Sequence, residues 1–241
     1  MMSNWKAFGI DAPLVPVLYL LAAVFLFVQG YVLRPAAPIV LEVIAAVIVF
    51  IEGGLFLHTT VRGKYRLFDQ LIPRLGVKAT DQILDLGCGR GALLTRLAGK
   101  LEKSGQAVGL DLWHSRDQSH NAAAVTQRNV TALGLTDRVK LVTGDMVALP
   151  FPDDQFDVIT TSFALHNIHG VQQRQQALQE AVRVLKPGGQ LVIIDTGHHA
   201  AEYRQILSAA HLDVREAHSL GINGWWSGPW MNSYLVRGVK L

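Results

Sequence analysis

The sequence has very little cysteine and few charged residues. Its only cysteine is Cys88, so no disulfide can form within the chain, and a reducing compartment fits. Only 17% of the 241 residues are charged, with a net charge of +3, whereas typical soluble domains have about a quarter. The sequence contains no dense run of Lys and Arg, which counts against a nucleic-acid groove.

The excess of apolar residues is concentrated near the N-terminus. Residues 14–33 contain no charged side chain, and a helix of that length spans about 30 Å, the thickness of the bilayer core. A second apolar run, residues 39–57, contains only Glu42 and Glu52 as charges. A cleaved signal peptide would have a shorter apolar region preceded by more positive charge. We therefore expect residues 1–58 to be a membrane anchor made of two transmembrane helices.

Basic residues near the ends of the two spans predict the orientation of this hairpin. Lys6 precedes the first span, and Arg62, Lys64 and Arg66 follow the second, whereas Arg34 stands alone in the turn. Positive residues close to the spans favour the cytoplasmic side. Both termini and the remainder of the chain are therefore expected to be cytoplasmic, in an integral membrane protein.

Residues 59–241 have the pattern of an α/β domain. An amphipathic helix is predicted over residues 63–75, where apolar side chains recur at helical spacing. Strand-like runs then alternate with helical segments such as 92–101 and 171–185, which predicts a parallel, doubly wound sheet. The strand-like runs begin at Gln82, Gln106, Val139, Phe156 and Gln190, and two further strands are expected from Leu212 and Trp230.

A glycine-rich turn follows the first of these strands, in the stretch ILDLGCGRGA at residues 83–92. Gly87, Gly89 and Ala92 fit the pattern of a dinucleotide-binding turn, G-x-G-x-x-A. Asp111 closes the second strand, where a carboxylate can accept hydrogen bonds from ribose hydroxyls. These residues alone leave NAD(P), FAD and S-adenosylmethionine open as cofactors.

Four motifs in order, DLGCGRG, VGLD, GDM and LKPGG, together with the two C-terminal strands, resemble class I S-adenosylmethionine-dependent methyltransferases of the type 11-like group. The resemblance covers roughly residues 63–240. It implies a Rossmann-like, seven-stranded methyltransferase sheet in residues 59–241, and it implies S-adenosylmethionine as the cofactor. The glycine motif by itself would be weak evidence.

The resemblance also implies a set of cofactor-binding residues. They are Asp85, Gly87, Gly89 and Gly91 around the methionine part, Asp111 at the ribose, Leu112 and Trp113 beside the adenine, Asp145 and Met146 at the adenine edge, and Ser162 at the methionine end.

A histidine is the predicted general base. His166 follows the fourth strand, and histidine changes its protonation state near neutral pH. The alternative is that His166 only packs or hydrogen-bonds its loop, because methyl transfer depends mainly on alignment. No metal site is expected, since neither HNIH at residues 166–169 nor the pair at 198–199 has supporting acidic or sulfur ligands.

The expected function is that of a membrane-anchored methyltransferase acting on a lipophilic small molecule, since the anchor keeps the active site close to a substrate dissolved in the bilayer. Two alternatives stay open. One is a methyltransferase of a soluble metabolite whose anchor only localises it, and the other is a non-catalytic, membrane-tethered S-adenosylmethionine-binding partner. Trp225, Trp226 and Trp230 fit the membrane interface or a substrate entrance, or packing within the last two strands.

Overall fold

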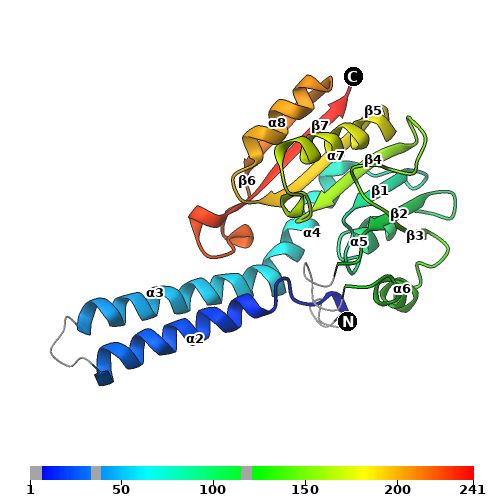
Figure 1. The fold of residues 1–241 in the computed structure, drawn as a ribbon. Coiled ribbons are helices and arrows are strands. Elements are labelled where there is room, and N and C mark those ends of the chain that lie inside the picture. The colour runs from blue at the N-terminus through cyan, green and yellow to red at the C-terminus, as the bar shows by residue number, and fades with distance from the viewer. Residues whose placement is uncertain (1–6, 34–38, 115–120) are drawn as a thin grey trace.

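The computed structural model describes residues 7–33, 39–114 and 121–241. A two-helix arm extends from an α/β body, and the first described residues lie against the body (Figure 1). Lys6 and Arg34, which contribute to the predicted orientation, lie outside the described residues.

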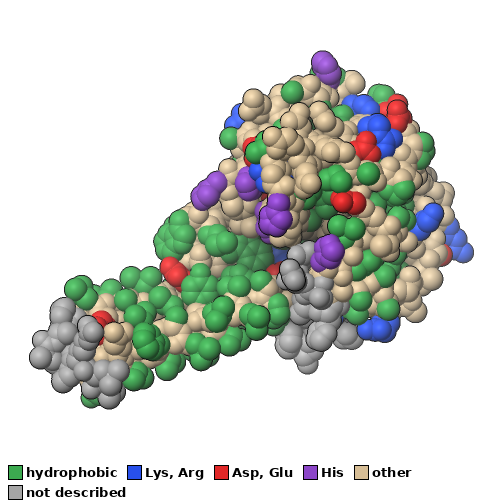
Figure 2. Space-filling view, viewed as in Figure 1, with side chains coloured by type: hydrophobic (Ala, Val, Ile, Leu, Met, Phe, Trp, Pro, Cys, Tyr) green, Lys and Arg blue, Asp and Glu red, His purple; other side chains and the backbone are tan. Residues whose placement is uncertain are grey.

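The arm consists of α2 (Leu14–Val28), which runs on into the π-helical turn η1 (Gln29–Leu33), and α3 (Ile39–His58). The two helices lie side by side (Figure 1), and the side chains on the face in view are mostly apolar (Figure 2). Both are long and apolar enough to cross a membrane, and only 11% of each apolar window is buried within the molecule. Helices in the core of a soluble protein bury most of their apolar side chains, and these two do not.

The arm and the body are joined by one continuous helix. α3 passes through a π-helical turn, η2 (Thr59–Gly63), directly into α4 (Lys64–Leu75). α4 is amphipathic, as its sequence predicts, and buries Phe68 and Leu71 against the body. The predicted division between residues 58 and 59 therefore falls inside this helix, and the assignment of two domains stays a prediction.

The body contains one seven-stranded sheet in the order β3-β2-β1-β4-β5-β7-β6. The first five strands are parallel, and β7 runs antiparallel to both of its neighbours. This is the seven-stranded, Rossmann-like arrangement that the motifs predicted. The strands are β1 (Gln82–Leu86), β2 (Gln106–Asp111), β3 (Val139–Thr143), β4 (Phe156–Ser162), β5 (Leu185–Thr196), β6 (Leu212–Ser219) and β7 (Ser233–Lys240).

β5 begins five residues earlier than its apolar run suggests. Leu185 pairs with Phe156 and Gln190 pairs with Val158, so the Lys-Pro-Gly-Gly segment between them forms an irregularity. The Lys186 ammonium lies 2.8 Å from both carboxylate oxygens of Asp157, which holds this segment against β4.

Helices cover both faces of the sheet. Successive side chains of a strand point to opposite faces, so each strand contributes to two hydrophobic clusters. Leu84 packs in a cluster with residues of α7 (Val171–Val184) and α8 (Ala200–Ala209), whereas its neighbour Ile83 packs in a second cluster. That second cluster contains side chains of α4, α5 (Leu94–Ala98) and α6 (Ala123–Ala132).

The β6–β7 loop (residues 220–232) packs against the π-helical turn η2. The hydroxyl of Thr59 donates a hydrogen bond to the carbonyl oxygen of Trp225 at 2.5 Å. Gly63 lies against the backbone of Asn223, and a Cβ atom at position 63 would overlap the Asn223 carbonyl oxygen. The absence of a side chain at position 63 therefore allows the loop to approach this helix.

We expect Gly63→Ala to lower the free energy of unfolding by about 1–3 kcal/mol, which is the usual cost of overpacking. The thermal midpoint of the full-length protein in detergent measures this loss. The matched control is Gly54→Ala on α3, because a Cβ atom there meets nothing within 4 Å. A Gly63→Ala protein as stable as the Gly54→Ala protein would contradict the loop packing.

Candidate active site

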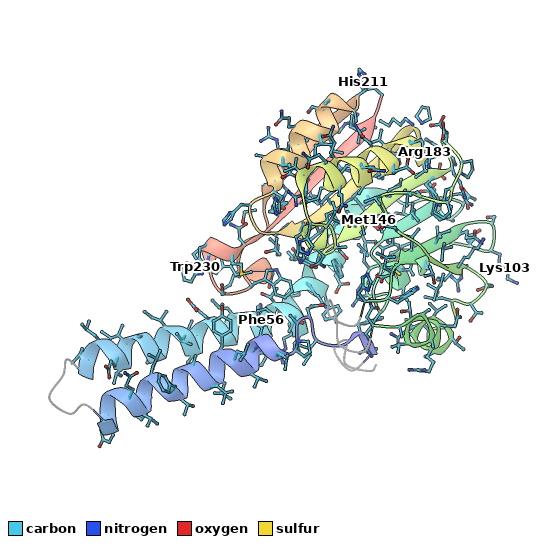
Figure 3. All side chains as sticks on the ribbon, viewed as in Figure 1. Phe56, Lys103, Met146, Arg183, His211 and Trp230 are labelled. Carbon is cyan, nitrogen blue, oxygen red and sulfur yellow. The ribbon has the colours of Figure 1, made fainter. Side chains whose placement is uncertain are left out.

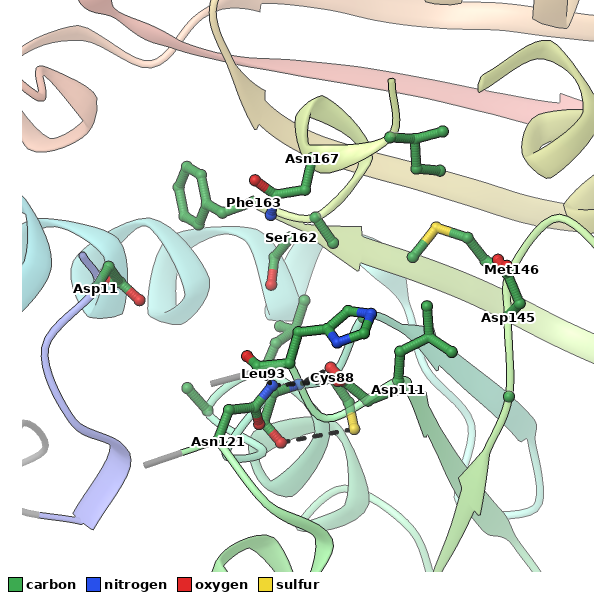
Figure 4. A pocket seen from close by; sticks show the side chains of 18 of the residues that line it. Asp11, Cys88, Leu93, Asp111, Asn121, Asp145, Met146, Ser162, Phe163 and Asn167 are labelled. Carbon is green, nitrogen blue, oxygen red and sulfur yellow. Dashed lines mark hydrogen bonds between the residues drawn. The ribbon is translucent and has the colours of Figure 1, made fainter. Parts of the chain in front are cut away.

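A cavity of about 730 Å³ opens at the carboxyl ends of the central strands. The strand order reverses between β1 and β4, which lie next to each other in the sheet and lead to helices on opposite faces. Such a reversal leaves a crevice beyond the strand ends, where open α/β sheets bind their ligands. The glycine turn after β1 and the segment after β4 form two walls of this cavity (Figure 4).

Seven of the ten predicted cofactor residues line the cavity, and three do not. Asp85 is completely buried beneath the glycine turn, and neither Gly91 nor Trp113 is part of the lining. The residues that line the cavity are Gly87, Gly89, Asp111, Leu112, Asp145, Met146 and Ser162. Their contacts with a cofactor stay a prediction.

Gly87 lets the first wall come close to the second. Its φ is +66°, a conformation that suits glycine, and a Cβ atom there would overlap the Cβ atom of Ala164. The Gly87 amide also donates to the carbonyl oxygen of Leu110 at 2.8 Å, which ties the turn to β2. At position 87 the turn can therefore present backbone, without a side chain, to a ligand.

Asp111 organises the part of the cavity at the end of β2. Its Oδ2 accepts from the Gly89 amide at 2.8 Å, and its Oδ1 accepts from the Trp113 amide at 2.5 Å and from Nδ2 of Asn121 at 3.2 Å. A carboxylate has about four acceptor positions, so it can still accept from a ligand hydroxyl. This position fits the ribose of S-adenosylmethionine.

Asn121 is a cavity residue that sequence motifs did not reveal. It is 6% exposed, and within the described parts of the chain its Oδ1 is buried without a hydrogen-bond partner. Since buried polar atoms are usually hydrogen-bonded, this oxygen is ready to accept from a ligand donor beside Asp111. The cavity residues therefore fit a ligand that carries hydroxyl or amine groups here.

Trp113 lies outside the cavity lining. Its indole nitrogen donates to the hydroxyl of Thr143 at 2.8 Å, so the ring covers the edge between β2 and β3. Of the two predicted adenine neighbours, only Leu112 lines the cavity.

The predicted base, His166, also lies outside the cavity lining. Its Nδ1 is 2.5 Å from Oδ1 of Asp195, a buried carboxylate that also accepts from the hydroxyl of Tyr203 at 3.0 Å. His169 and His114, by contrast, both line the cavity. The role of His166 as a base stays a prediction, and the placement favours His169 over His166 as a histidine that faces a ligand.

The base of the arm closes the other end of the cavity. Lys64 and Asp11 both line it, and the Lys64 ammonium is 2.5 Å from the Asp11 carboxylate. The same carboxylate accepts from the hydroxyl of Thr60 at 2.7 Å. Phe163, which follows β4 with a φ of +54°, adds an aromatic ring to this end.

Comparison with known proteins agrees with this arrangement. Residues 84–193 match the family model described as a methyltransferase domain. The fold resembles that of an S-adenosylmethionine-dependent methyltransferase from Aquifex aeolicus, with a TM-score of 0.59 at 21% identity over 72% of this chain and 89% of that one. The family match supports the predicted methyltransferase class and S-adenosylmethionine as the cofactor, and the structural match shows that the fold is shared.

Curated relatives are similar over part of the chain. A demethylmenaquinone methyltransferase from Lactiplantibacillus plantarum is 36% identical over 53% of this chain and 50% of its own length. The ubiquinone/menaquinone biosynthesis C-methyltransferase UbiE of Pseudomonas fluorescens is 32% identical over 55% of this chain and 49% of its own length. The chain thus spans about half the length of the curated relatives that it matches.

We expect Asp111→Ala to weaken binding of S-adenosylhomocysteine about 10-fold to 150-fold, because hydrogen bonds to a charged acceptor contribute roughly 1.5–3 kcal/mol. Calorimetry on the full-length protein in detergent measures this change. The control is Asp137→Ala, whose half-exposed carboxylate lies outside the cavity lining. Equal affinities of the two variants, with Asp111→Ala folded, would remove Asp111 from the cofactor site.

Asp85 makes stability depend on pH. Burial raises the pKa of its carboxyl group to about 7, against the effect of the Thr160 hydroxyl, which donates to Oδ1 at 2.7 Å and lowers the pKa. Between about pH 4 and pH 7 the folded state therefore holds a proton that the unfolded chain releases.

The contribution of Asp85 to the free energy of unfolding consequently falls as pH rises through this window. We expect Asp85→Asn, which cannot ionise, to flatten the dependence of the thermal midpoint on pH between about 4 and 7. Asp137→Asn serves as the exposed control and should keep the wild-type slope. An Asp85→Asn protein with the wild-type slope would show that Asp85 is ionised in the folded state.

Proposed function

We propose that this chain transfers a methyl group from S-adenosylmethionine to a lipophilic, quinone-type acceptor, and that the α2–α3 hairpin holds it in a membrane. The observation that carries the proposal is the cavity, which extends from Asp111 and Asn121 at the sheet to Lys64 and Phe163 at the base of the arm. The acceptor class is supported by the relatives, whose names refer to menaquinone and ubiquinone.

Different cavity residues would contact different parts of the cofactor. When bound, S-adenosylmethionine supplies an electrophilic methyl group on a positively charged sulfur. Asp111 and Asn121 would hold its ribose and neighbouring polar groups, Leu112 and Met146 would contact the adenine, and the Gly87 backbone would face the amino-acid part. Transfer then depends chiefly on alignment, which a rigid site at the strand ends provides.

Methylation of a ring carbon also requires that the acceptor lose a proton. We propose that a cavity histidine accepts it. His169 has a better position than His166, because both follow β4 but only His169 lines the cavity. The hydrogen bond between Nδ1 of His166 and Asp195 instead holds the short helical turn η3 (Leu165–Asn167) in place. If His166 is the base, as its sequence position predicts, the turn must rearrange when the acceptor binds.

The hairpin supports the lipophilic acceptor class on physical grounds. A quinone with a long apolar tail dissolves in the bilayer, so an enzyme held at the membrane meets it at a high effective concentration. The orientation proposed for the hairpin has both termini and residues 59–241 in the cytoplasm. Methylation of a soluble metabolite and a non-catalytic binding role remain the alternatives to be tested.

The test uses full-length protein in lipid vesicles with labelled S-adenosylmethionine and two reduced naphthoquinones, one with a long prenyl tail and one with a short polar substituent. We expect label on a ring carbon of the prenylated compound, at a rate at least ten times that for the polar one at equal total concentration. Mass spectrometry of the extracted product locates the methyl group. Asp111→Ala is the control and should be slower than wild type when S-adenosylmethionine is below saturation.

Three outcomes would contradict the proposal. Faster methylation of the polar compound in vesicles would favour the soluble-metabolite alternative. Tight cofactor binding with neither compound methylated would favour the binding role. Full activity of His169→Gln, together with loss of activity in His166→Gln, would return the role of base to His166.

A further inference from the structure

The β6–β7 loop (residues 220–232) has the composition of a buried segment but is partly exposed. None of its thirteen residues carries a charge, although 17% of the chain is charged. Three large apolar side chains of the loop are exposed, Ile222 by 57%, Trp230 by 59% and Met231 by 42%. Within the described part of the body, exposed large apolar side chains are uncommon. Three of them in one loop therefore indicate a surface that contacts a partner.

The loop lies where α3 reaches the end of its apolar run. Nε2 of His58 is 3.3 Å from Oδ1 of Asn223, and Thr59 donates to the backbone of Trp225. The ring of Phe56 packs against Trp226 with 5.1 Å between ring centroids. Figure 3 shows Trp230 at the edge of the body nearest the arm, beside the segment of α3 that contains Phe56.

This position coincides with the end of the apolar part of the hairpin. The run that begins at Ile39 ends at Leu57, and a helix of that length matches the hydrocarbon core. The bilayer boundary therefore falls close to His58, at the height of the β6–β7 loop. Tryptophan prefers this boundary, because its ring is largely apolar and its N–H group is polar.

Exposed positive charges follow immediately on the same helix. Arg62 and Arg66 are both exposed, within about two turns of His58. Basic residues next to a membrane span attract the anionic headgroups of the cytoplasmic leaflet. Apolar side chains at the boundary with cations beyond them match the layers of a lipid surface, whereas a water-soluble protein partner gives no reason for this order.

We propose that Ile222, Trp230 and Met231 form a second membrane contact, inserted at the boundary between headgroups and acyl chains beside α3. This inference rests on the proposed insertion of the α2–α3 hairpin. It adds that the body lies on the bilayer surface in one orientation, with the β6–β7 loop against the lipid.

The contact connects the lipid surface with the cavity. On its inner side the loop carries Trp226, which is 5% exposed and packs edge-on against Phe163 with ring centroids 5.2 Å apart. Phe163 in turn lines the cavity. One loop therefore faces lipid with Trp230 and supports the aromatic cavity wall with Trp226, so the acceptor end of the cavity lies close to the bilayer surface.

The test is a depth measurement on the full-length protein in vesicles that contain anionic lipid. A nitroxide label is attached at Trp230→Cys, and its collisions with lipid-soluble oxygen and with a water-soluble nickel chelate are compared. Two matched positions are labelled in separate variants, Leu133→Cys on the body and Phe25→Cys on α2, both exposed apolar residues like Trp230. Wild-type protein, whose Cys88 is buried, corrects for background labelling.

We expect the Trp230 label to collide with the nickel chelate at least five times less often than the Leu133 label, and the Phe25 label to be the most accessible to oxygen. A Trp230 label as accessible to the chelate as Leu133, with Phe25 in lipid, would overturn the second contact and leave the hairpin intact. If the Phe25 label is also exposed to the chelate, the insertion of the hairpin itself fails.

A second measurement does not depend on labelling. Trp230→Glu introduces a charge at the proposed boundary, and we expect it to raise the KM for the prenylated acceptor in vesicles at least threefold while affinity for S-adenosylhomocysteine is unchanged. Leu133→Glu is the control and should leave both quantities as they are. An unchanged KM in Trp230→Glu, with methylation intact, would overturn the inference while the proposed function stands.

Discussion

The relation between the arm and the cavity depends on one buried ion pair, between the Lys64 ammonium and the Asp11 carboxylate. The Lys64 side chain is 3% exposed and the Asp11 side chain 20%. Removal of Asp11 would leave the Lys64 ammonium buried without its counter-charge, at a cost of up to about 3–5 kcal/mol. Asp11 precedes α2, whereas Lys64 begins α4, so the pair closes the base of the hairpin. Both residues line the cavity. The position of the proposed membrane hairpin and the shape of the ligand site are therefore set by the same contact.

The π-helical turn η2 provides the geometry for this contact. A π-helical turn adds a residue to a helix and commonly occurs at functional sites. Here its residues Thr59 and Thr60 are fully buried and turn to different partners, Thr59 to the β6–β7 loop and Thr60 to Asp11. A single short segment thus contacts both the residue Asp11 before α2 and the β6–β7 loop, and the helix continues through it from the arm into the body.

Much of the fold could be predicted because hydrophobic periodicity reports secondary structure directly. The predicted strands from Gln82, Gln106 and Phe156 begin where the sequence places them, and α3 agrees with its predicted span to within one residue. The start of β5 was not predicted. The Lys-Pro-Gly-Gly segment has the sequence of a turn, but Leu185, which precedes it, already pairs with Phe156 of β4. The cavity was predicted in part. Glycines and acids at strand ends form recognisable motifs, whereas Asn121 and His169 belong to no motif.

The sequence by itself determined the α/β class of the body, the two apolar helices and the residue types at the carboxyl ends of the strands, because these depend on local periodicity and on residues at fixed spacing. Only the tertiary structure decided which side chains share a cavity. It placed Asp11 beside Lys64, His169 rather than His166 in the lining, and Trp226 between Phe56 and Phe163. Some of these contacts join residues that are distant along the chain, and others depend on nearby residues that point in different directions. Both follow from tertiary packing, which no local sequence pattern records.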